Sequence, residues 1–177
     1  MSTRIAKPLR VLSTGYNGVM LQGEHMSSVI VRKHDIELME GEPKTHSLNS
    51  NAVRSVKSLG AITGLKGLGF HLVELEPGYE STEFHFHHYE DECVYVLSGE
   101  ATVTIGDDIF QVSMGDFIGH PARGEAHTMK NTGNDKFVYL VAGQRLAHDI
   151  VDYPNLNKRL YINDDSSDLV SIQDIEA

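Results

Sequence analysis

The chain has few cations, a single cysteine and no long hydrophobic run. Its 177 residues include 15 Lys and Arg against 25 Asp and Glu, a formal net charge of −10. Nucleic acids and anionic membranes are bound through clustered cations, so this balance argues against both as main partners. One cysteine cannot form an internal disulfide framework and fits a reducing compartment. No apolar stretch approaches the roughly 18–20 residues of a membrane helix. We therefore expect a soluble, cytoplasmic protein.

The cations that are present include a group at the start of the chain. The first 23 residues carry three positive charges and no Asp or Glu. A basic, acid-free start is a property of targeting peptides, but polar residues and glycines interrupt the apolar segment that a secretory signal needs. We interpret residues 1–27 as a flexible leader. The alternative is an upstream start codon, with Met26 as the natural beginning.

Short strand patterns separated by turn residues dominate the rest of the chain. Strands are expected at residues 29–31, 70–75, 93–97, 101–105, 109–112 and 137–142. Residues 58–69 contain four glycines and are expected to form a flexible loop or a bulged strand. The acidic cluster at 164–168 is expected to be a solvated loop. Many short strands at close spacing indicate an antiparallel sandwich or barrel.

The ten histidines include one pair with metal-ligand spacing, His85 and His87. On a strand their side chains point the same way, with Cα atoms roughly 6.5–7 Å apart, which lets both imidazoles reach one ion. Glu92 begins the next strand pattern. His127 lies beyond the following hairpin, where an antiparallel sheet can return it beside the pair. Three imidazoles and a carboxylate suit Fe(II), Mn(II), Ni(II), Co(II) or Zn(II).

The spacing around these residues resembles the first motif of the cupins. That motif is a glycine, five residues, His-X-His, three or four residues, Glu, six residues and a second glycine. Here Gly78 is followed by six residues, His85 and His87, then four residues, Glu92, six residues and Gly99. The string from Glu92 to Gly99, Glu-Cys-Val-Tyr-Val-Leu-Ser-Gly, is also similar. The one departure is the extra residue before the histidine pair, and it removes no ligand.

A second stretch is similar to the second cupin motif, which is a glycine, five residues, Pro-X-Gly, two residues, His, three residues and Asn. Here Gly115 is followed by five residues, Pro121, two residues and Gly124. After two intervening residues comes His127, and after three more intervening residues comes Asn131. The extra residue between the proline and the glycine falls in an expected turn. Both motifs occur in order with every ligand position filled.

The resemblance implies an all-β fold, the double-stranded β-helix or jelly-roll barrel, over residues 65–147. Residues 28–64 would form an N-terminal extension that packs on the barrel, and residues 148–177 a C-terminal extension. The resemblance assigns one divalent transition metal ion (Fe, Mn, Ni, Co or Zn) inside the barrel. Its ligands would be His85, His87, Glu92 and His127.

Neighbouring residues offer rival ligands. Glu90 is the competing carboxylate, but the string after Glu92 favours the latter as the ligand. His88 falls on the opposite face of the strand and is expected to point outward. His120 precedes a proline in an expected turn and is interpreted as a surface residue. Cys93 has the opposite parity to its neighbour Glu92 and is interpreted as a buried core residue, not a ligand.

Four protein ligands leave two positions open on a six-coordinate ion. This predicts a metal-dependent enzyme acting on a small oxygen-bearing molecule, as a sugar phosphate isomerase, dioxygenase, decarboxylase or lyase. The alternative is a non-catalytic cupin that binds or senses a small molecule. The sequence identifies no acid–base residue. The extensions, with apolar residues between 150 and 162, predict a homodimer, and the alternative is that they dock onto the chain's own barrel.

Overall fold

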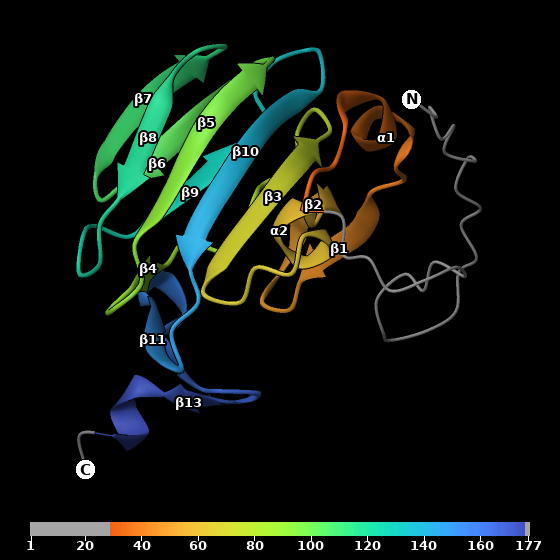
Figure 1. Cartoon of the computed structure of the whole chain (residues 1–177). Coiled ribbons are helices and arrows are strands. Elements are labelled where there is room, and N and C mark those ends of the chain that lie inside the picture. Colours follow the sequence, from red (N-terminus) through yellow and green to blue (C-terminus); the bar gives the residue numbers. More distant parts are fainter. Residues whose placement is uncertain (1–28, 176–177) are drawn as a thin grey trace, which may run out of the picture.

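The computed structural model describes residues 29–175, which form mainly antiparallel strands (Figure 1). The predicted leader, residues 1–27, lies outside the described residues. The strands are β1 (Glu42–His46), β2 (Asn49–Lys57), β3 (Leu68–Leu75), β4 (Phe86–His87), β5 (Glu92–Ser98), β6 (Glu100–Ile105), β7 (Asp108–Ser113), β8 (Phe117–His120), β9 (His127–Lys130), β10 (Phe137–Gln144), β11 (His148–Tyr153), β12 (Lys158–Asn163) and β13 (Ser166–Ser171). The helical elements are α1 (Lys33–Leu38), α2 (Leu59–Ile62) and two 3₁₀ turns (Pro154–Leu156 and Ile172–Asp174). The predicted all-β class is confirmed.

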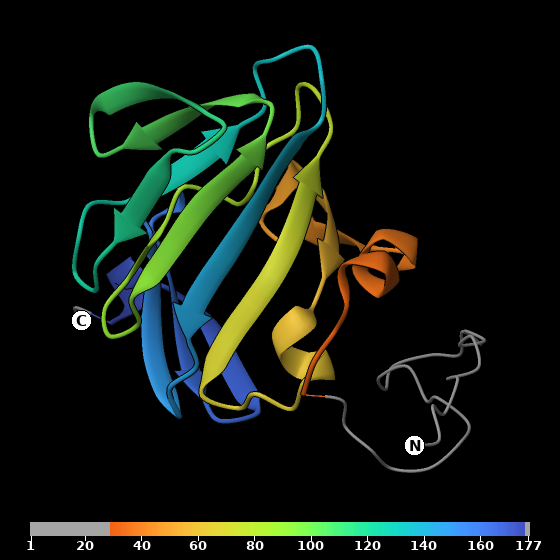
Figure 2. The same cartoon turned by 45° about the horizontal axis from the view of Figure 1, so that its top comes forward.

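Two sheets build the barrel. A six-stranded sheet has the order β1-β2-β3-β10-β5-β8, and a three-stranded sheet has the order β7-β6-β9. Figure 2 shows β5, β10 and β3 side by side, with the smaller sheet closing the barrel beside them. Alternating apolar residues of both sheets meet in one core. Its buried members include Val73, Val94 and Phe137 from the large sheet and Val103 and Met129 from the small one. The predicted jelly-roll architecture is confirmed.

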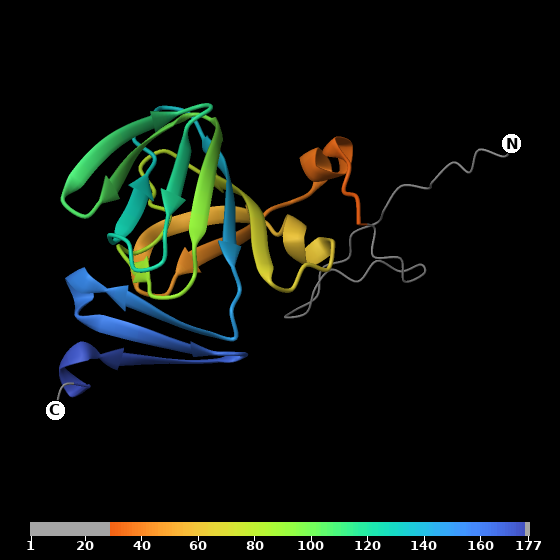
Figure 3. The same ribbon diagram turned by 60° about the vertical axis from the view of Figure 1, so that its left-hand side comes forward.

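The C-terminal residues form a separate sheet that reaches the predicted metal ligands. Its order is β13-β12-β11-β4, and it lies at one end of the barrel (Figures 1 and 3). The histidine-pair strand β4 is paired with β11, with Val151 opposite His87 and Asp152 opposite Phe86. The residues after the barrel therefore help to fix the backbone of the histidine pair.

The N-terminal residues extend the large sheet, since β2 pairs antiparallel with β3. Two expectations for this part of the chain are wrong. Residues 29–31 form an irregular segment before α1, not a strand. Val29 and Ile30 are exposed, and β-branched residues favour strands mainly where neighbours cover them. Residues 59–62 form α2 and residues 68–69 begin β3, so the expected loop or bulged strand is wrong at these positions, whereas residues 63–67 between them form a loop as expected.

The acidic cluster is only partly a loop. Asp164 and Asp165 form the turn between β12 and β13, as expected. Residues 166–168 belong to β13 and pair with β12, although they are exposed. Within residues 29–175 no helix has both the length and the apolar character that crossing a membrane requires.

Candidate metal centre

Three of the predicted ligands, His85, His87 and His127, come together through strand register. The backbones of His85 and His127 form an antiparallel bridge, with reciprocal N–H···O bonds of 3.2 and 2.8 Å. Their ring centroids lie 4.7 Å apart, and those of His85 and His87 lie 5.1 Å apart. The sheet therefore returns His127 beside the pair across more than 40 residues of sequence.

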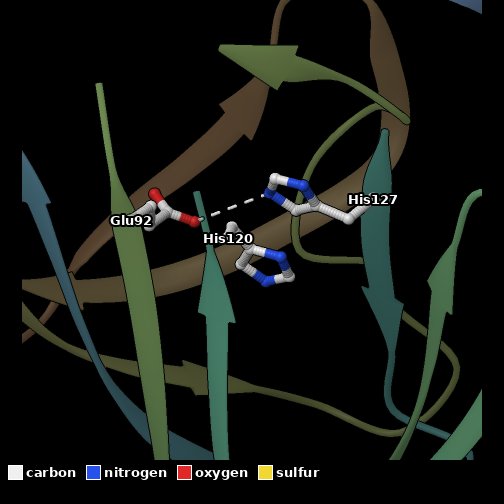
Figure 4. Close-up of side chains that lie close together, drawn as sticks. All are labelled: Glu92, His120 and His127. Carbon is white, nitrogen blue, oxygen red and sulfur yellow. Dashed lines mark ion pairs between the residues drawn. The ribbon is translucent and has the colours of Figure 1, made fainter. Parts of the chain in front are cut away.

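The fourth predicted ligand, Glu92, begins β5 and faces the same interior. Its Oε1 lies 3.9 Å from Nε2 of His127 (Figure 4). Ligand atoms of Glu92, His120 and His127 all lie within 4.8 Å of one another. His87 belongs to a second such group, with Glu90 and Asp149. The predicted ligands are thus divided: Glu92 and His127 fall in one group, His87 falls in another, and His85 falls in neither, although its ring contacts those of His87 and His127.

The residue that sequence reasoning misplaced is His120. It was expected on the surface, yet it is only 5% exposed and its ring stacks on that of His127, with centroids 3.5 Å apart and planes 6° apart. The cause is register, because His120 ends β8 directly opposite Glu92 of β5 and so points to the same face. The alternation of side chains along this strand could have predicted that His120 points inward. His120 lies two residues after Ile118, a buried core residue of the same short strand.

Each predicted histidine ligand directs its Nδ1 toward an acceptor. The acceptors are the carbonyl of Glu83 for His85 at 2.8 Å, the carboxylate of Asp149 for His87 at 2.5 Å, and the carbonyl of Glu125 for His127 at 3.4 Å. An imidazole that donates from Nδ1 has its lone pair on Nε2. This is the usual arrangement of a metal-binding histidine, in which an outer partner fixes the tautomer.

The buried Nε2 atoms test whether a metal fits. Nε2 of His127 and Nε2 of His120 are both buried without a hydrogen-bond partner among residues 29–175. Buried polar atoms in proteins are rarely unpaired, because the lost hydration is not replaced. A cation bound by Nε2 of His127 and the carboxylate of Glu92 would remove that cost. The donor set therefore fits a divalent transition metal.

Burial sets the charge states at this site. It lowers the pKa of His85 to about 3, with His127 and His87 adding to the effect. Burial likewise lowers the pKa of His120 to about 4. Burial alone would raise the pKa of Glu92, but the surrounding imidazoles, led by His127, outweigh it, so the pKa is lowered. These shifts favour neutral imidazoles and a carboxylate at neutral pH, the forms that bind metals.

A cavity of about 350 Å³ opens beside these groups. His87, Glu92, His120 and His127 are among the residues that line it. Its wall also includes three cationic side chains, Lys44 of β1, Arg54 of β2 and Arg145 after β10. Arg54 donates to the carbonyl of Ser81, and Arg145 lies 3.3 Å from a ring nitrogen of His71. The cavity thus contains imidazoles, three cationic side chains and three acidic ones, Glu90, Asp91 and Glu92.

The remaining residues considered from sequence have other partners. Glu90 accepts a hydrogen bond from the backbone N–H of Leu146 at 2.7 Å. His88 lies 3.1 Å from the carboxylate of Asp152, away from the imidazole cluster. Cys93 is half-buried and lies outside the core, contrary to expectation, because it shares the outer face of β5 with Tyr95, whereas Val94 and Val96 point into the core.

The chain is similar to proteins of known family. The family model described as a cupin domain matches residues 71–143, which include all four predicted ligands. The structure of a candidate sugar phosphate isomerase from Acidithiobacillus ferrooxidans is 49% identical, with a TM-score of 0.82. The match covers 84% of this chain and 96% of that chain. The chain belongs to the cupin family.

Two further cupin comparisons are more distant. A sugar phosphate isomerase of the cupin superfamily from Silicibacter pomeroyi is 24% identical, covers 78% of this chain and 92% of its own, and has a TM-score of 0.72. That likeness supports the fold. The tetracenomycin polyketide synthase protein TcmJ from Streptomyces glaucescens is 29% identical over 86 residues, which are 49% of this cupin. This cupin spans about half, 54%, of the length of that curated relative.

Proposed function

We propose that this cupin is a metal-dependent enzyme that acts on a small anionic molecule rich in oxygen, as a sugar phosphate isomerase. The observation that carries the proposal is the buried imidazole cluster. Its Nδ1 atoms have acceptors, and Nε2 of His127 is left unpartnered 3.9 Å from a carboxylate. Burying ring nitrogens that have neither a hydrogen-bond partner nor a bound cation lowers the stability of the fold, which argues against a barrel with a purely structural role.

The metal would be held by His85, His87, Glu92 and His127. A bound divalent ion supplies Lewis acidity, which polarises a carbonyl or hydroxyl oxygen of the substrate. His120 is better placed as a cavity-lining group than as a fifth ligand. The lone pair on Nε2 lies in the ring plane, and parallel rings 3.5 Å apart direct their lone pairs along separate planes. One ion therefore suits His127 or His120, but not both.

The cations in the cavity favour a phosphorylated substrate over an uncharged sugar. Lys44, Arg54 and Arg145 line the cavity together with three acids, Glu90, Asp91 and Glu92. Glu92 is assigned to the metal, and Glu90 and Asp91 accept backbone N–H groups, which leaves the three cations for the substrate. Lysine and arginine are the side chains that most often bind phosphate and carboxylate groups. The 49% identical relative, a candidate sugar phosphate isomerase, agrees with this substrate class.

A direct assay tests the proposal. The purified protein is stripped of metal and reloaded separately with Fe(II), Mn(II), Ni(II), Co(II) and Zn(II). Interconversion of aldose and ketose phosphates is then followed by NMR. We expect turnover with at least one metal, and a raised KM in Arg145→Met. The control Arg123→Met, whose side chain stacks on Tyr89 outside the cavity lining, should leave KM unchanged.

The assay also separates the enzyme from a sensor. Tight binding of sugar phosphates without turnover under all five metals would overturn the enzyme proposal and support a ligand-binding cupin. Turnover of uncharged sugars at equal efficiency would contradict the role of the cations. Consumption of dioxygen or release of CO₂ would instead identify a dioxygenase or a decarboxylase.

The proposal includes a homodimer. Tyr95 of β5 and Phe117 of β8 are cross-strand partners and are 45% and 67% exposed. They lie at the β8 edge of the large sheet, where a second copy would cover both an edge and an aromatic pair. Light scattering on the purified protein should give the mass of two chains. Phe117→Lys should shift it toward one chain, and a monomeric wild-type protein would contradict the proposal.

A further inference from the structure

Asp149 of β11 is one of the most deeply buried acidic residues of the described chain and is 1% exposed. Its Oδ2 lies 2.5 Å from Nδ1 of His87, and its Oδ1 accepts the backbone N–H of Tyr89 at 3.0 Å. Both carboxylate oxygens are therefore occupied by groups on the segment that carries the histidine pair. Asp149 also lies beyond residues 71–143, the part that matches the cupin model.

The geometry points to Asp149 as a positioning residue that holds the proton of His87 on Nδ1 and so keeps the Nε2 lone pair available to a metal. This inference rests on the proposed metal site. The backbone supports the same role, because β4 pairs with β11 and the N–H of His88 donates to the carbonyl of Ile150 at 2.8 Å. The C-terminal sheet thus fixes both the ring orientation and the tautomer of one ligand.

The variant Asp149→Asn tests this with little change in shape. The backbone N–H of Tyr89 can only donate, so the amide oxygen of the new side chain stays on Tyr89. The amide NH₂ then faces Nδ1 of His87, which must accept. The ring proton moves to Nε2, the atom that a metal would need. Loss of such an outer partner typically lowers metal affinity by about 10- to 100-fold.

Asp152 provides a matched control on the same strand. It is also buried and also carboxylate-paired to a histidine of the same segment, since its Oδ2 lies 3.1 Å from Nε2 of His88. His88 is not a predicted ligand. Asp152→Asn therefore removes a similar charge from the same strand without touching His87. Asp152 also accepts from Arg159 at 2.6 and 2.8 Å, so the control counts only where circular dichroism shows a wild-type fold. It should leave metal affinity within about threefold of the wild type.

Two measurements decide the question. The first is the ¹⁵N–¹H correlation spectrum of the histidine rings in the metal-free protein, with His87 assigned by its absence in His87→Gln. We expect Nδ1–H in the wild type and in Asp152→Asn, and Nε2–H in Asp149→Asn. The second is the Zn(II) and Co(II) dissociation constant by chelator competition, which should rise about 10- to 100-fold in Asp149→Asn only.

The outcomes separate this inference from the proposed function. A wild-type protein that binds neither metal overturns the metal site, while the ring spectra still test the tautomer. Wild-type binding with unchanged affinity and unchanged Nδ1–H in Asp149→Asn overturns the role of Asp149. If that variant does not fold, as judged by circular dichroism, the wild-type spectrum alone decides, because a His87 ring with its proton on Nε2 and none on Nδ1 contradicts the inference.

Discussion

The imidazole rings of His120 and His127 lie face to face, with centroids 3.5 Å apart and planes 6° apart. Both rings are buried, and both Nε2 atoms are unpartnered among residues 29–175. Parallel rings direct their lone pairs along separate planes, so the two residues have different roles. Of the two, His127 is the bridge partner of His85, and we assign it to the metal.

This assignment predicts that His120→Phe keeps its metal. Phenylalanine preserves the stacking and has no buried nitrogen to satisfy, so the free energy of unfolding should change by less than about 1.5 kcal/mol. Elemental analysis should give the same metal content per chain as the wild type. His127→Phe is the matched control and should lose the metal. Loss of metal in a folded His120→Phe protein would place His120 among the ligands.

Metal removal should destabilise the wild type and leave Glu92→Gln almost unaffected. A ligand present at 100 times its dissociation constant stabilises the native state by about 2.7 kcal/mol. Glu92 supplies the only carboxylate of the predicted ligand set, so its loss weakens binding and most of this gain disappears. Urea unfolding with and without metal measures the difference. Equal metal-dependent stabilisation of both proteins would contradict the ligand role of Glu92.

Much of the barrel could be predicted from sequence because its strands alternate and are bounded by turn residues. The expected strand at 101–105 lies within β6, and that at 137–142 lies within β10. The strand predicted from the short apolar run at 29–31 does not form, because a strand also needs a neighbouring surface to cover it. The prediction of a loop or bulged strand at 58–69 missed the helix at 59–62, because glycine spacing alone does not distinguish a loop from a short packed helix.

At the site, too, the features set by local spacing could be predicted and those set by the pairing of distant strands could not. The spacing of His85 and His87 is local, so strand parity was enough to place both on one face. The positions of His120 and Asp149 depend on pairing between distant strands, β8 with β5 and β11 with β4. A single sequence does not contain that register. The one local indication that His120 points inward was Ile118, a hydrophobic residue two positions earlier on the same strand, which is buried.

Gly99 should not tolerate a side chain. Its φ is +81°, and an added Cβ would lie 2.6 Å from the carbonyl oxygen of Lys136. The close approach is to backbone, which cannot rotate away as a flexible side chain would. Gly99→Ala should therefore lower the free energy of unfolding by about 1–3 kcal/mol in urea titrations. Gly115→Ala is an informative control, because its φ is +96° but nothing lies within 4 Å of an added Cβ, so it should cost less.

The C-terminal sheet depends on the ion pair between Arg159 and Asp152. Arg159 donates to both carboxylate oxygens, at 2.6 and 2.8 Å, across the β11–β12 pair. Arg159→Met would leave a buried carboxylate with only His88 as a partner. Since Arg159 is partly exposed, we expect a loss of about 1–3 kcal/mol in the free energy of unfolding. Faster hydrogen exchange in β11 and β12 should accompany it. Arg123→Met loses only an exposed 3.3 Å hydrogen bond to the carbonyl of His88 and a contact with Tyr89, so it should cost less and leave β12 unchanged.

Glu74 should make part of the stability of the barrel depend on pH. The hydrogen bond from Lys136 at 2.9 Å is the main cause that holds the pKa of Glu74 below its ordinary 4.5, and Lys57 adds to it. A carboxyl whose pKa is lowered by folding stabilises the native state above the unfolded pKa. That stability is lost as the pH falls through the folded pKa.

Lys136→Met should therefore be less stable than the wild type near pH 7, by less than about 1 kcal/mol because Lys136 is exposed. Lys136 also pairs with Glu76 at 3.2 Å, so the difference should shrink below pH 4.5 and vanish once both carboxyls are protonated. Urea unfolding at intervals between pH 3 and pH 7 measures it. Lys33→Met removes a more exposed pair, with Glu37, and should give a flat difference. A Lys136→Met difference that grows as the pH falls would have the wrong sign for this ion pair.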